Sequence, residues 1–149
     1  MHDIEFKYFI YEQNKLPPGL KKELKAIDKK LFGDSEPIVF KDTDWVFITA
    51  PESGDIFAYG AIRNYSDYHY LSRCGVVGAY QGNGLQKELI KSRIALAKTS
   101  GNLPVITYTM HNNPASMNSL IACGFKTYRP GNKWAGKEMV YWNYEPSKY

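Results

Sequence analysis

YQGNGLQ, residues Tyr80 to Gln86, lies between an apolar run that ends at Val77 and a helical pattern that begins at Leu85. Gly82 and Gly84 can adopt backbone angles that side chains disfavour. Consecutive backbone N–H groups can therefore converge on one anion where the helix begins, and the partial positive charge of the helix start favours a phosphate there. Two glycines spaced by one residue also form ordinary turns. On this stretch alone, a phosphate site and a simple turn both stay open.

A second motif follows the helix. It reads NPASMNSLIACGF, and a strand-like apolar run from Val105 to Met110 precedes it. The resulting order is strand, glycine loop, helix, strand, helix and strand. The two motifs in this order resemble the GNAT superfamily of acetyl-coenzyme A dependent N-acetyltransferases, which share RGxGxG or RGxGxA after a valine-containing strand and a later NxxSxxxLxxxGF. The resemblance covers Leu71 to Phe125, and the second motif is matched at Asn113, Ser116, Leu120, Gly124 and Phe125.

Hydrophobic patterning and turn signals extend the prediction to the whole chain. We predict an α/β (α+β) protein, a single GNAT-like domain over residues 1–149 with a mixed, twisted sheet of six or seven strands and helices on both faces. A lysine-rich helix follows the first strand, and Asn113 before Pro114 is a typical helix N-cap. The expected strands are 4–12, 45–50, 55–63, 70–77, 105–110, 125–128 and 138–144, and two further helices span 81–100 and 113–124.

Composition is consistent with one packed domain, since the chain has 149 residues of which 44% are apolar and 15% aromatic. It has no run of about eighteen apolar residues, and its first residues, MHDIEF, lack the features of a signal peptide. We therefore expect a cytoplasmic protein with no membrane partner. Cys74 and Cys123 lack metal-ligand spacing, which predicts two free thiols and no metal.

The formal net charge of +4 suits an anionic partner, and coenzyme A, nucleic acids and acidic protein surfaces all meet that condition. Much of the excess lies in KKELKAIDKK, residues 21–30. Apolar residues at helical spacing, Leu20, Leu24, Ile27 and Leu31, leave the lysines largely on other faces. A solvated helix face is therefore favoured over a nucleic-acid patch, because no nucleic-acid motif accompanies the lysines.

The resemblance implies how the cofactor is held. Backbone N–H groups from Gln81 through Gln86 would bind the pyrophosphate of coenzyme A, the main chain of Cys74 and Val76 would pair with its pantetheine arm, and the Val76 N–H would face the thioester carbonyl. Gln86 replaces a small residue of the family pattern, and its side chain is expected to project away. The predicted cofactor-binding residues are Cys74, Val76, Gln81, Gly82, Asn83, Gly84, Leu85, Gln86, Asn113 and Ser116.

Two of these positions have plain structural alternatives. The role of helix N-cap is sufficient to account for Asn113. Ser116 can form a hydrogen bond with the main chain instead of reaching the cofactor.

Catalytic residues are harder to predict. Many family members carry a glutamate on the signature strand as general base and a tyrosine in the second motif as general acid. This strand has no carboxylate, and Leu120 occupies the tyrosine position. If the strand alternates, Tyr70, Ser72 and Cys74 share one face. Tyr70 as a proton relay and Ser72 as a residue that positions water are the catalytic candidates, with roles as a strand aromatic and a polar filler as their alternatives.

The cluster of Tyr65, Tyr68, His69 and Tyr70 precedes the signature strand, where the resemblance implies the mouth of the acceptor cleft. Aromatic faces suit an ammonium group or an apolar side chain. With 12 tyrosines in the chain, chance clustering is an alternative. His69 has the side chain best suited to accept a proton near neutral pH, and a simple surface position is its alternative.

These observations predict an N-acetyltransferase that transfers an acetyl group from acetyl-coenzyme A, its co-substrate, to a primary amine of a small molecule or protein. The missing glutamate and tyrosine support an alternative, a catalytically reduced acyl-coenzyme A binding or regulatory domain of the same fold. A basic nucleic-acid binding protein, in which YQGNGLQ is a mere turn, is the least favoured reading. The sequence leaves a homodimer open.

Overall fold

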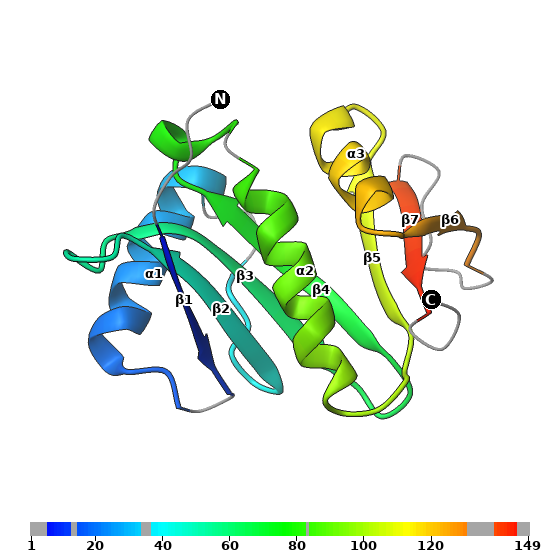
Figure 1. Ribbon diagram of the computed structural model, residues 1–149, viewed down its shortest axis with the longest axis horizontal. Coiled ribbons are helices and arrows are strands. Elements are labelled where there is room, and N and C mark those ends of the chain that lie inside the picture. The colour runs from blue at the N-terminus through cyan, green and yellow to red at the C-terminus, as the bar shows by residue number, and fades with distance from the viewer. Residues whose placement is uncertain (1–5, 13–14, 34–36, 83, 131–138, 146–149) are drawn as a thin grey trace.

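Seven strands form one mixed sheet in the order β1-β2-β3-β4-β5-β7-β6 (Figure 1). The structure is a computed structural model that describes residues 6–12, 15–33, 37–82, 84–130 and 139–145. Its elements confirm the predicted fold class and element order. They are β1 (Lys7–Tyr11), α1 (Pro18–Phe32), β2 (Thr43–Thr49), β3 (Ile56–Asn64), β4 (His69–Val76), the 3-10 turn η1 (Gly78–Tyr80), α2 (Leu85–Lys98), β5 (Val105–Met110), α3 (Pro114–Ala122), β6 (Lys126–Tyr128) and β7 (Met139–Tyr144).

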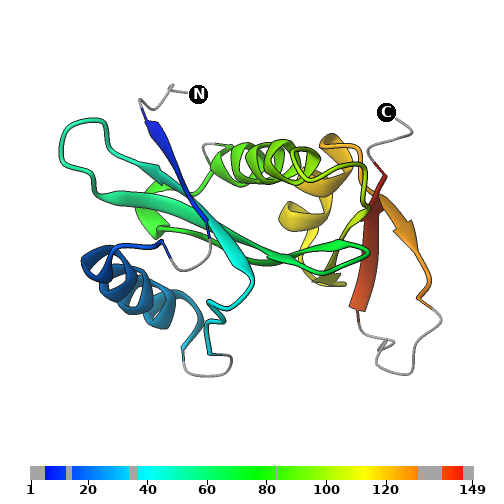
Figure 2. The ribbon, with the colours of Figure 1, turned by 90° about the horizontal axis from the view of Figure 1, so that it is seen from below.

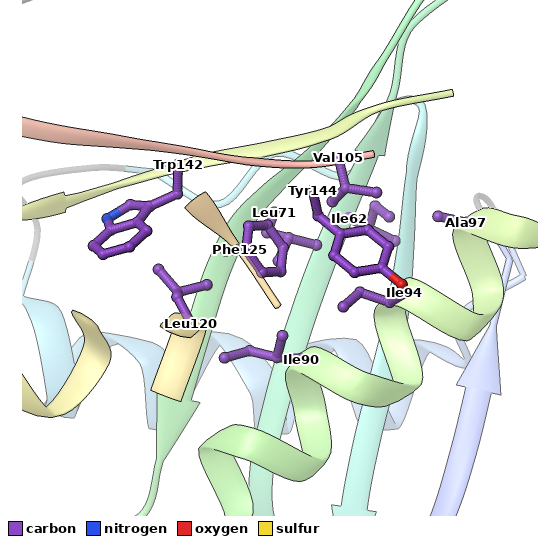
Figure 3. Close-up of a cluster of buried hydrophobic side chains, with 10 residues drawn as sticks. All are labelled: Ile62, Leu71, Ile90, Ile94, Ala97, Val105, Leu120, Phe125, Trp142 and Tyr144. Carbon is purple, nitrogen blue, oxygen red and sulfur yellow. The ribbon is translucent and has the colours of Figure 1, made fainter. Parts of the chain in front are cut away.

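Helices cover both faces of the sheet, as predicted. Figure 2 shows α2 and α3 above the sheet and α1 below it, on the side of β1 to β3. Between the sheet and the α2/α3 layer lies a large apolar cluster, in which side chains of β3, β4, β5 and β7 point toward those of the two helices (Figure 3). Its buried members are Ile62, Leu71, Ile90, Ile94, Ala97, Val105, Leu120, Phe125, Trp142 and Tyr144.

The lysine-rich helix α1 packs on the other face as its pattern predicts. Leu24 is fully buried against Trp45 and Phe47, whereas Lys22 and Lys25 are exposed. A solvated lysine face thus accounts for this part of the basic charge.

One polar residue of α1 breaks the apolar pattern. Asp28 is only 3% exposed, accepts hydrogen bonds from Arg73 of β4 and accepts another from the Tyr59 hydroxyl at 2.6 Å. Burial, with the Asp28 carboxylate adding to it, raises the pKa of Tyr59 well above its usual value, so this hydroxyl stays protonated and donates. Asp28 is committed to these partners and therefore anchors α1 to β4.

Strands β4 and β5 are parallel and pair only at His69 with Val105 and at Tyr70 with Ile106. Beyond Tyr70 they diverge toward the end of the sheet where α2 and α3 begin (Figure 1). No strand among the described residues fills the gap, so the edges of β4 and β5 face each other across it. This divergence defines the place of the candidate site.

Strand β4 contains a β-bulge at Ser72. Ala61 pairs with Arg73 while Ile62 pairs with Leu71, which leaves Ser72 as the extra residue. The prediction that Tyr70, Ser72 and Cys74 share one face is therefore wrong, because the bulge interrupts the alternation. Tyr70 stacks on Tyr108 of β5 on the face opposite to α2, whereas Cys74 packs with the apolar residues under α2.

Candidate functional site

The glycine loop leaves the first turn of α2 open. Gly82 and Gly84 have φ angles of 83° and 77°, in the region that favours glycine, and Gly84 is the N-cap residue of α2. Among the described residues no side chain caps this helix, so the N–H groups of its first turn lack partners inside the helix. A Cβ atom built on either glycine would meet nothing within 4 Å. The loop therefore exposes donors to open space, which favours an anion.

A cavity of about 450 Å³ lies in front of this loop, which we call the loop cavity. The end of α1, the end of β4 and the first turn of α3 complete its wall. Asn83 lies outside the described residues. All nine described members of the predicted cofactor set line the loop cavity: Cys74, Val76, Gln81, Gly82, Gly84, Leu85, Gln86, Asn113 and Ser116.

The edge of β4 faces the loop cavity with its main chain. The Val77 N–H donates to the Phe57 carbonyl at 2.9 Å, and Val76 lies opposite Ala58. Because hydrogen-bonded and non-hydrogen-bonded pairs alternate in an antiparallel ladder, the N–H and C=O groups of Cys74 and Val76 point away from β3. They are directed into the gap that β5 does not close. An extended ligand arm can pair with such an edge as another strand would.

A second cavity, of about 190 Å³, occupies the gap between β4 and β5, and we call it the strand cavity. It shares Cys74, Gln86 and Ser116 with the loop cavity. Its far end is lined by Tyr70 and Thr107. The two cavities therefore form a path from the glycine loop to Tyr70, where β4 and β5 come together.

The first turns of α2 and α3 are joined across this path. Asn113 is confirmed as the N-cap of α3, since its Oδ1 accepts from the Ser116 N–H at 3.2 Å. The Ser116 hydroxyl accepts a hydrogen bond from Gln86 Nε2 at 2.8 Å. The Gln86 side chain, expected to project away, lies instead between the loop cavity and the strand cavity. At Val76 the carbonyl likewise has a side-chain partner, because Gln81 Nε2 donates to it at 3.1 Å.

If the path holds acetyl-coenzyme A, as the family resemblance implies, we expect Gln86→Ala to strengthen its binding about fivefold. A ligand arm that follows the path must displace the Gln86–Ser116 hydrogen bond, and a bond of this kind has a net value of about 1 kcal/mol. Ser116→Ala is the matched control, since it removes the same bond and keeps the glutamine. Dissociation constants from calorimetry decide the question, and weaker binding by Gln86→Ala would instead mean that Gln86 contacts the cofactor.

Residues 6–125 match the model of the acetyltransferase (GNAT) family. This chain belongs to the GNAT family. Proteins of this family use acyl-coenzyme A together with an acceptor, which agrees with a long path that begins at an open helix start. Among curated proteins, none matches this sequence.

Solved structures show the same fold. The ribosomal-protein-S18-alanine N-acetyltransferase from Escherichia coli superposes with a TM-score of 0.71 at 14% identity, covering 93% of this chain and 94% of that one. Escherichia coli ElaA gives 0.74 at 13% identity, over 95% and 100%. A Bacillus anthracis protein assigned as a streptothricin acetyltransferase, solved in complex with acetyl coenzyme A, gives 0.58 at 20% identity, over 70% and 63%. At these identities the likeness concerns the fold alone.

Two further findings concern the part of this GNAT chain that the structure describes. None of its helices is long and apolar enough to cross a membrane. It also contains no cluster of three or more His, Cys, Asp or Glu side chains that could hold a metal ion. Cys74 and Cys123 are free thiols, as predicted.

Arg93 of α2 is a site residue that the sequence analysis missed. It is 2% exposed, and its guanidinium donates to the carbonyls of Leu89, Ala61 and Arg73 at 3.0–3.1 Å. Ala61 and Arg73 lie opposite each other in β3 and β4, next to the point where the register of the two strands shifts. Arg93 therefore holds the bulge in place from the α2 side of the sheet, and it lines the strand cavity.

The neighbours of Arg93 accommodate its charge. A Cβ atom on Gly60 would lie 2.9 Å from Arg93 Nε, so the guanidinium packs directly on the β3 backbone. Burial lowers the pKa of Arg93, and burial raises the pKa of the adjacent Cys74 thiol, with the guanidinium pulling that thiol the other way. Cys74 is therefore held as a neutral thiol rather than as a nucleophilic thiolate. The signal in the sequence was a cation within the apolar stripe of α2, four residues after Leu89.

The surface alternative for His69 is wrong. The ring is 2% exposed at the start of β4, and its Nδ1 lies 2.7 Å from Asn64 Oδ1. Because Asn64 Nδ2 donates to Asp44, the Asn64 oxygen is the acceptor and His69 Nδ1 carries the proton. Burial lowers the pKa of His69. It lines neither cavity of the path and is therefore not placed to act as a base for the acceptor.

The two catalytic candidates both lie at the strand cavity, with Ser72 at the bulge and Tyr70 at the far end. Leu120, at the position of the family tyrosine, is buried in the core and also lines this cavity. None of the described residues that line the strand cavity carries a carboxylate or an imidazole. The structure thus offers hydroxyl groups here, and its charged groups are Arg73 and Arg93.

Proposed function

We propose that this GNAT protein transfers an acetyl group from acetyl-coenzyme A to a primary amine of a small molecule or protein. One observation carries the proposal: the open first turn of α2 and the outward-facing edge of β4 lie along one path that ends at Tyr70. The first element suits a pyrophosphate and the second suits the amide-bearing pantetheine arm. This order places the thioester near the bulge.

In this proposal the protein acts mainly by positioning and by electrostatics. The N–H groups of the glycine loop and of the first turn of α2 hold the pyrophosphate, and the Val76 N–H faces the thioester carbonyl. The amine lone pair attacks that carbonyl carbon, the C–S bond breaks, and the amide and the coenzyme A thiol are released. The proton lost by the amine passes to solvent through Tyr70, and Ser72 positions water beside it. We further propose one domain over residues 1–149 that works in the cytoplasm.

The test is turnover. Purified protein with acetyl-coenzyme A and a panel of primary amines should release free coenzyme A thiol in an amine-dependent manner. The second candidate, a catalytically reduced acyl-coenzyme A binding domain, is favoured by the absence of a carboxylate or imidazole among the described residues of the strand cavity. Tight binding of acetyl-coenzyme A without thiol release from any amine would support that candidate and contradict turnover.

Tyr70→Phe is expected to lower kcat about tenfold. Removing an acid–base group typically costs about 10²–10⁴-fold, and we expect less here because solvent can replace a relay. Tyr108→Phe is the control, since Tyr108 stacks on Tyr70 and lines the same cavity. Steady-state kinetics of both variants make the comparison. If Tyr70→Phe turns over like the wild type, or if both variants lose activity equally, Tyr70 is not the relay.

A further inference from the structure

A third cavity, of about 240 Å³, is lined by six tyrosines, and we call it the tyrosine cavity. Within the sheet, Tyr108 of β5 lies opposite Tyr141 of β7, and Tyr141 lies opposite Tyr128 of β6. These side chains lie on the face of the sheet opposite to α2 and α3. Helix α1 packs on the same face but covers only its other end, at β1 to β3 (Figure 2). Tyr70 extends the row onto β4, and Tyr65 and Tyr68 close it from the β3–β4 connection.

Two pairs of rings in the wall of the tyrosine cavity are stacked, whereas Tyr141 is tilted at 48° to Tyr108 and edge-on at 69° to Tyr128. The rings of Tyr65 and Tyr68 lie 4.7 Å apart at 21°. Those of Tyr70 and Tyr108 lie 6.1 Å apart at 19°. Near-parallel aromatic faces present large apolar area and match another flat ring. The geometry thus favours a planar aromatic group over a bulky or extended aliphatic one.

Charge around the tyrosine cavity favours a neutral ligand over an ammonium. None of the described lining residues is charged. The Arg63 guanidinium already lies over the Tyr65 ring at 5.4 Å. Burial raises the pKa of the Tyr68 hydroxyl, with Asp67 adding to this shift and Arg63 opposing it. Aromatic faces can contact an ammonium, but none of the described lining residues supplies a carboxylate that would pair with it or remove its proton.

The tyrosine cavity opens onto the far end of the path. It shares Tyr70, Thr107 and Tyr108 with the strand cavity. None of the described residues lining either cavity carries a carboxylate or an imidazole that could deprotonate an ammonium. An amine that reacts here must therefore arrive without a proton. Amines attached directly to an aromatic ring meet this condition at neutral pH, because the ring withdraws their lone pair and makes them weak bases.

From these observations we infer that the tyrosine cavity binds the acceptor, and that the acceptor is an aromatic amine. This inference rests on the proposed function. The amine nitrogen attacks the thioester carbonyl of acetyl-coenzyme A, the C–S bond breaks and the thiolate leaves. The nitrogen loses a proton to solvent, and the thiolate takes up a proton from solvent to give the thiol. The products are an N-aryl acetamide and coenzyme A. Ring stacking supplies recognition, and the low basicity of the amine replaces the missing general base.

The test compares aniline, benzylamine and cyclohexylamine as acceptors at equal concentrations, after binding of acetyl-coenzyme A has been measured separately. Aniline should give the highest kcat/KM at pH 7 and a rate that is nearly flat from pH 6 to 8. Benzylamine, which keeps the ring but is protonated, should be slower and gain about tenfold per pH unit. Cyclohexylamine, which lacks the flat ring, should be the poorest acceptor.

Tyr128→Ala locates the acceptor in the tyrosine cavity. Tyr128 lies on the edge strand β6 and lines the tyrosine cavity but neither the loop cavity nor the strand cavity. We expect its loss to raise KM for aniline about tenfold while the dissociation constant of acetyl-coenzyme A stays unchanged. Tyr8→Ala is the matched control, an exposed tyrosine on β1 at the opposite edge of the sheet. Tyr128→Leu, which keeps apolar volume without a flat ring, serves if the alanine variant does not fold.

The outcomes separate the two proposals. Failure to bind acetyl-coenzyme A contradicts the proposed function itself. Intact binding with cyclohexylamine or benzylamine preferred at pH 7, or an unchanged KM for aniline in the Tyr128 variants, overturns the aromatic-amine inference and leaves the proposed function standing. Intact binding without turnover of any amine overturns the inference and supports the regulatory alternative.

Discussion

Gly84→Asp is expected to weaken binding of acetyl-coenzyme A about a thousandfold and to leave the fold intact. The new carboxylate would stand beside the open first turn of α2, where the pyrophosphate is proposed to bind. Two unit charges about 4 Å apart repel by about 4 kcal/mol near a protein surface, which corresponds to this factor. Protein contacts do not oppose the substitution, since a Cβ atom at Gly84 meets nothing within 4 Å.

Gly84→Asn isolates the charge from the backbone effect. The φ angle of Gly84 is 77°, which glycine prefers but asparagine and aspartate both tolerate. The two variants therefore share the same strain and nearly the same bulk. We expect the asparagine variant to lose tenfold or less in affinity. Equal affinity of Gly84→Asp and the wild type, with both proteins folded by circular dichroism, would contradict the phosphate site at this loop.

Arg93→Met is expected to lower the free energy of unfolding by about 4 kcal/mol. The methionine fills a similar volume but removes the hydrogen bonds that the guanidinium donates to the carbonyls of Ala61 and Arg73. A hydrogen bond that involves a charged group contributes about 1.5–3 kcal/mol, and two such bonds account for the expected loss. Because these carbonyls flank the bulge at Ser72, activity should fall further than stability explains. Urea unfolding and kcat/KM are the measurements.

Lys91→Met is the matched control on the same helix. Its side chain is 59% exposed and forms a long ion pair with Glu88, at 3.9 Å. Substitutions at such positions usually change stability by less than about 0.5 kcal/mol. If Arg93→Met were as stable as Lys91→Met, the guanidinium would not be supporting β4. Arg93→Lys adds a second comparison, since one ammonium cannot reproduce the fork that reaches two carbonyls.

Local patterns predicted the elements of this fold well. The strand at 105–110 matches β5 to the residue, and Asn113 caps α3 as its position before proline predicted. The helix expected from residue 81 begins at Leu85 instead, because positive φ angles at Gly82 and Gly84 are incompatible with a continuous helix. These features depend on neighbours along the chain, which is why the sequence alone sufficed.

Features that depend on contacts between distant residues were missed. The alternation expected for β4 fails at Ser72, where the register with β3 shifts beside the carbonyls that Arg93 contacts. His69 is buried, and Asn64 on the preceding strand accepts a hydrogen bond from its Nδ1. In the sequence, Asp28 is one more charged residue of a lysine-rich helix. Only the fold shows that Arg73 and Tyr59 donate hydrogen bonds to it. Periodicity within one segment contains none of this information.

In the candidate site, too, the features set by local sequence were predicted and those set by contacts between distant residues were missed. Residues that would act through their backbone were predicted from two short motifs, since glycine spacing fixes where N–H groups converge. The tyrosine cavity was predicted only in part. Tyr65, Tyr68 and Tyr70 form a visible cluster, whereas Tyr108, Tyr128 and Tyr141 reach the same place only because β5, β6 and β7 are adjacent in the sheet.

Calorimetric titration of the purified protein with acetyl-coenzyme A tests the central claim most directly, with coenzyme A and ATP as comparison ligands. We predict a single site with micromolar affinity for acetyl-coenzyme A, a measurable difference between acetyl-coenzyme A and coenzyme A, and much weaker binding of ATP. No binding of acetyl-coenzyme A, or equal binding of ATP, would contradict the assignment of the glycine loop and the β4 edge as a coenzyme A site.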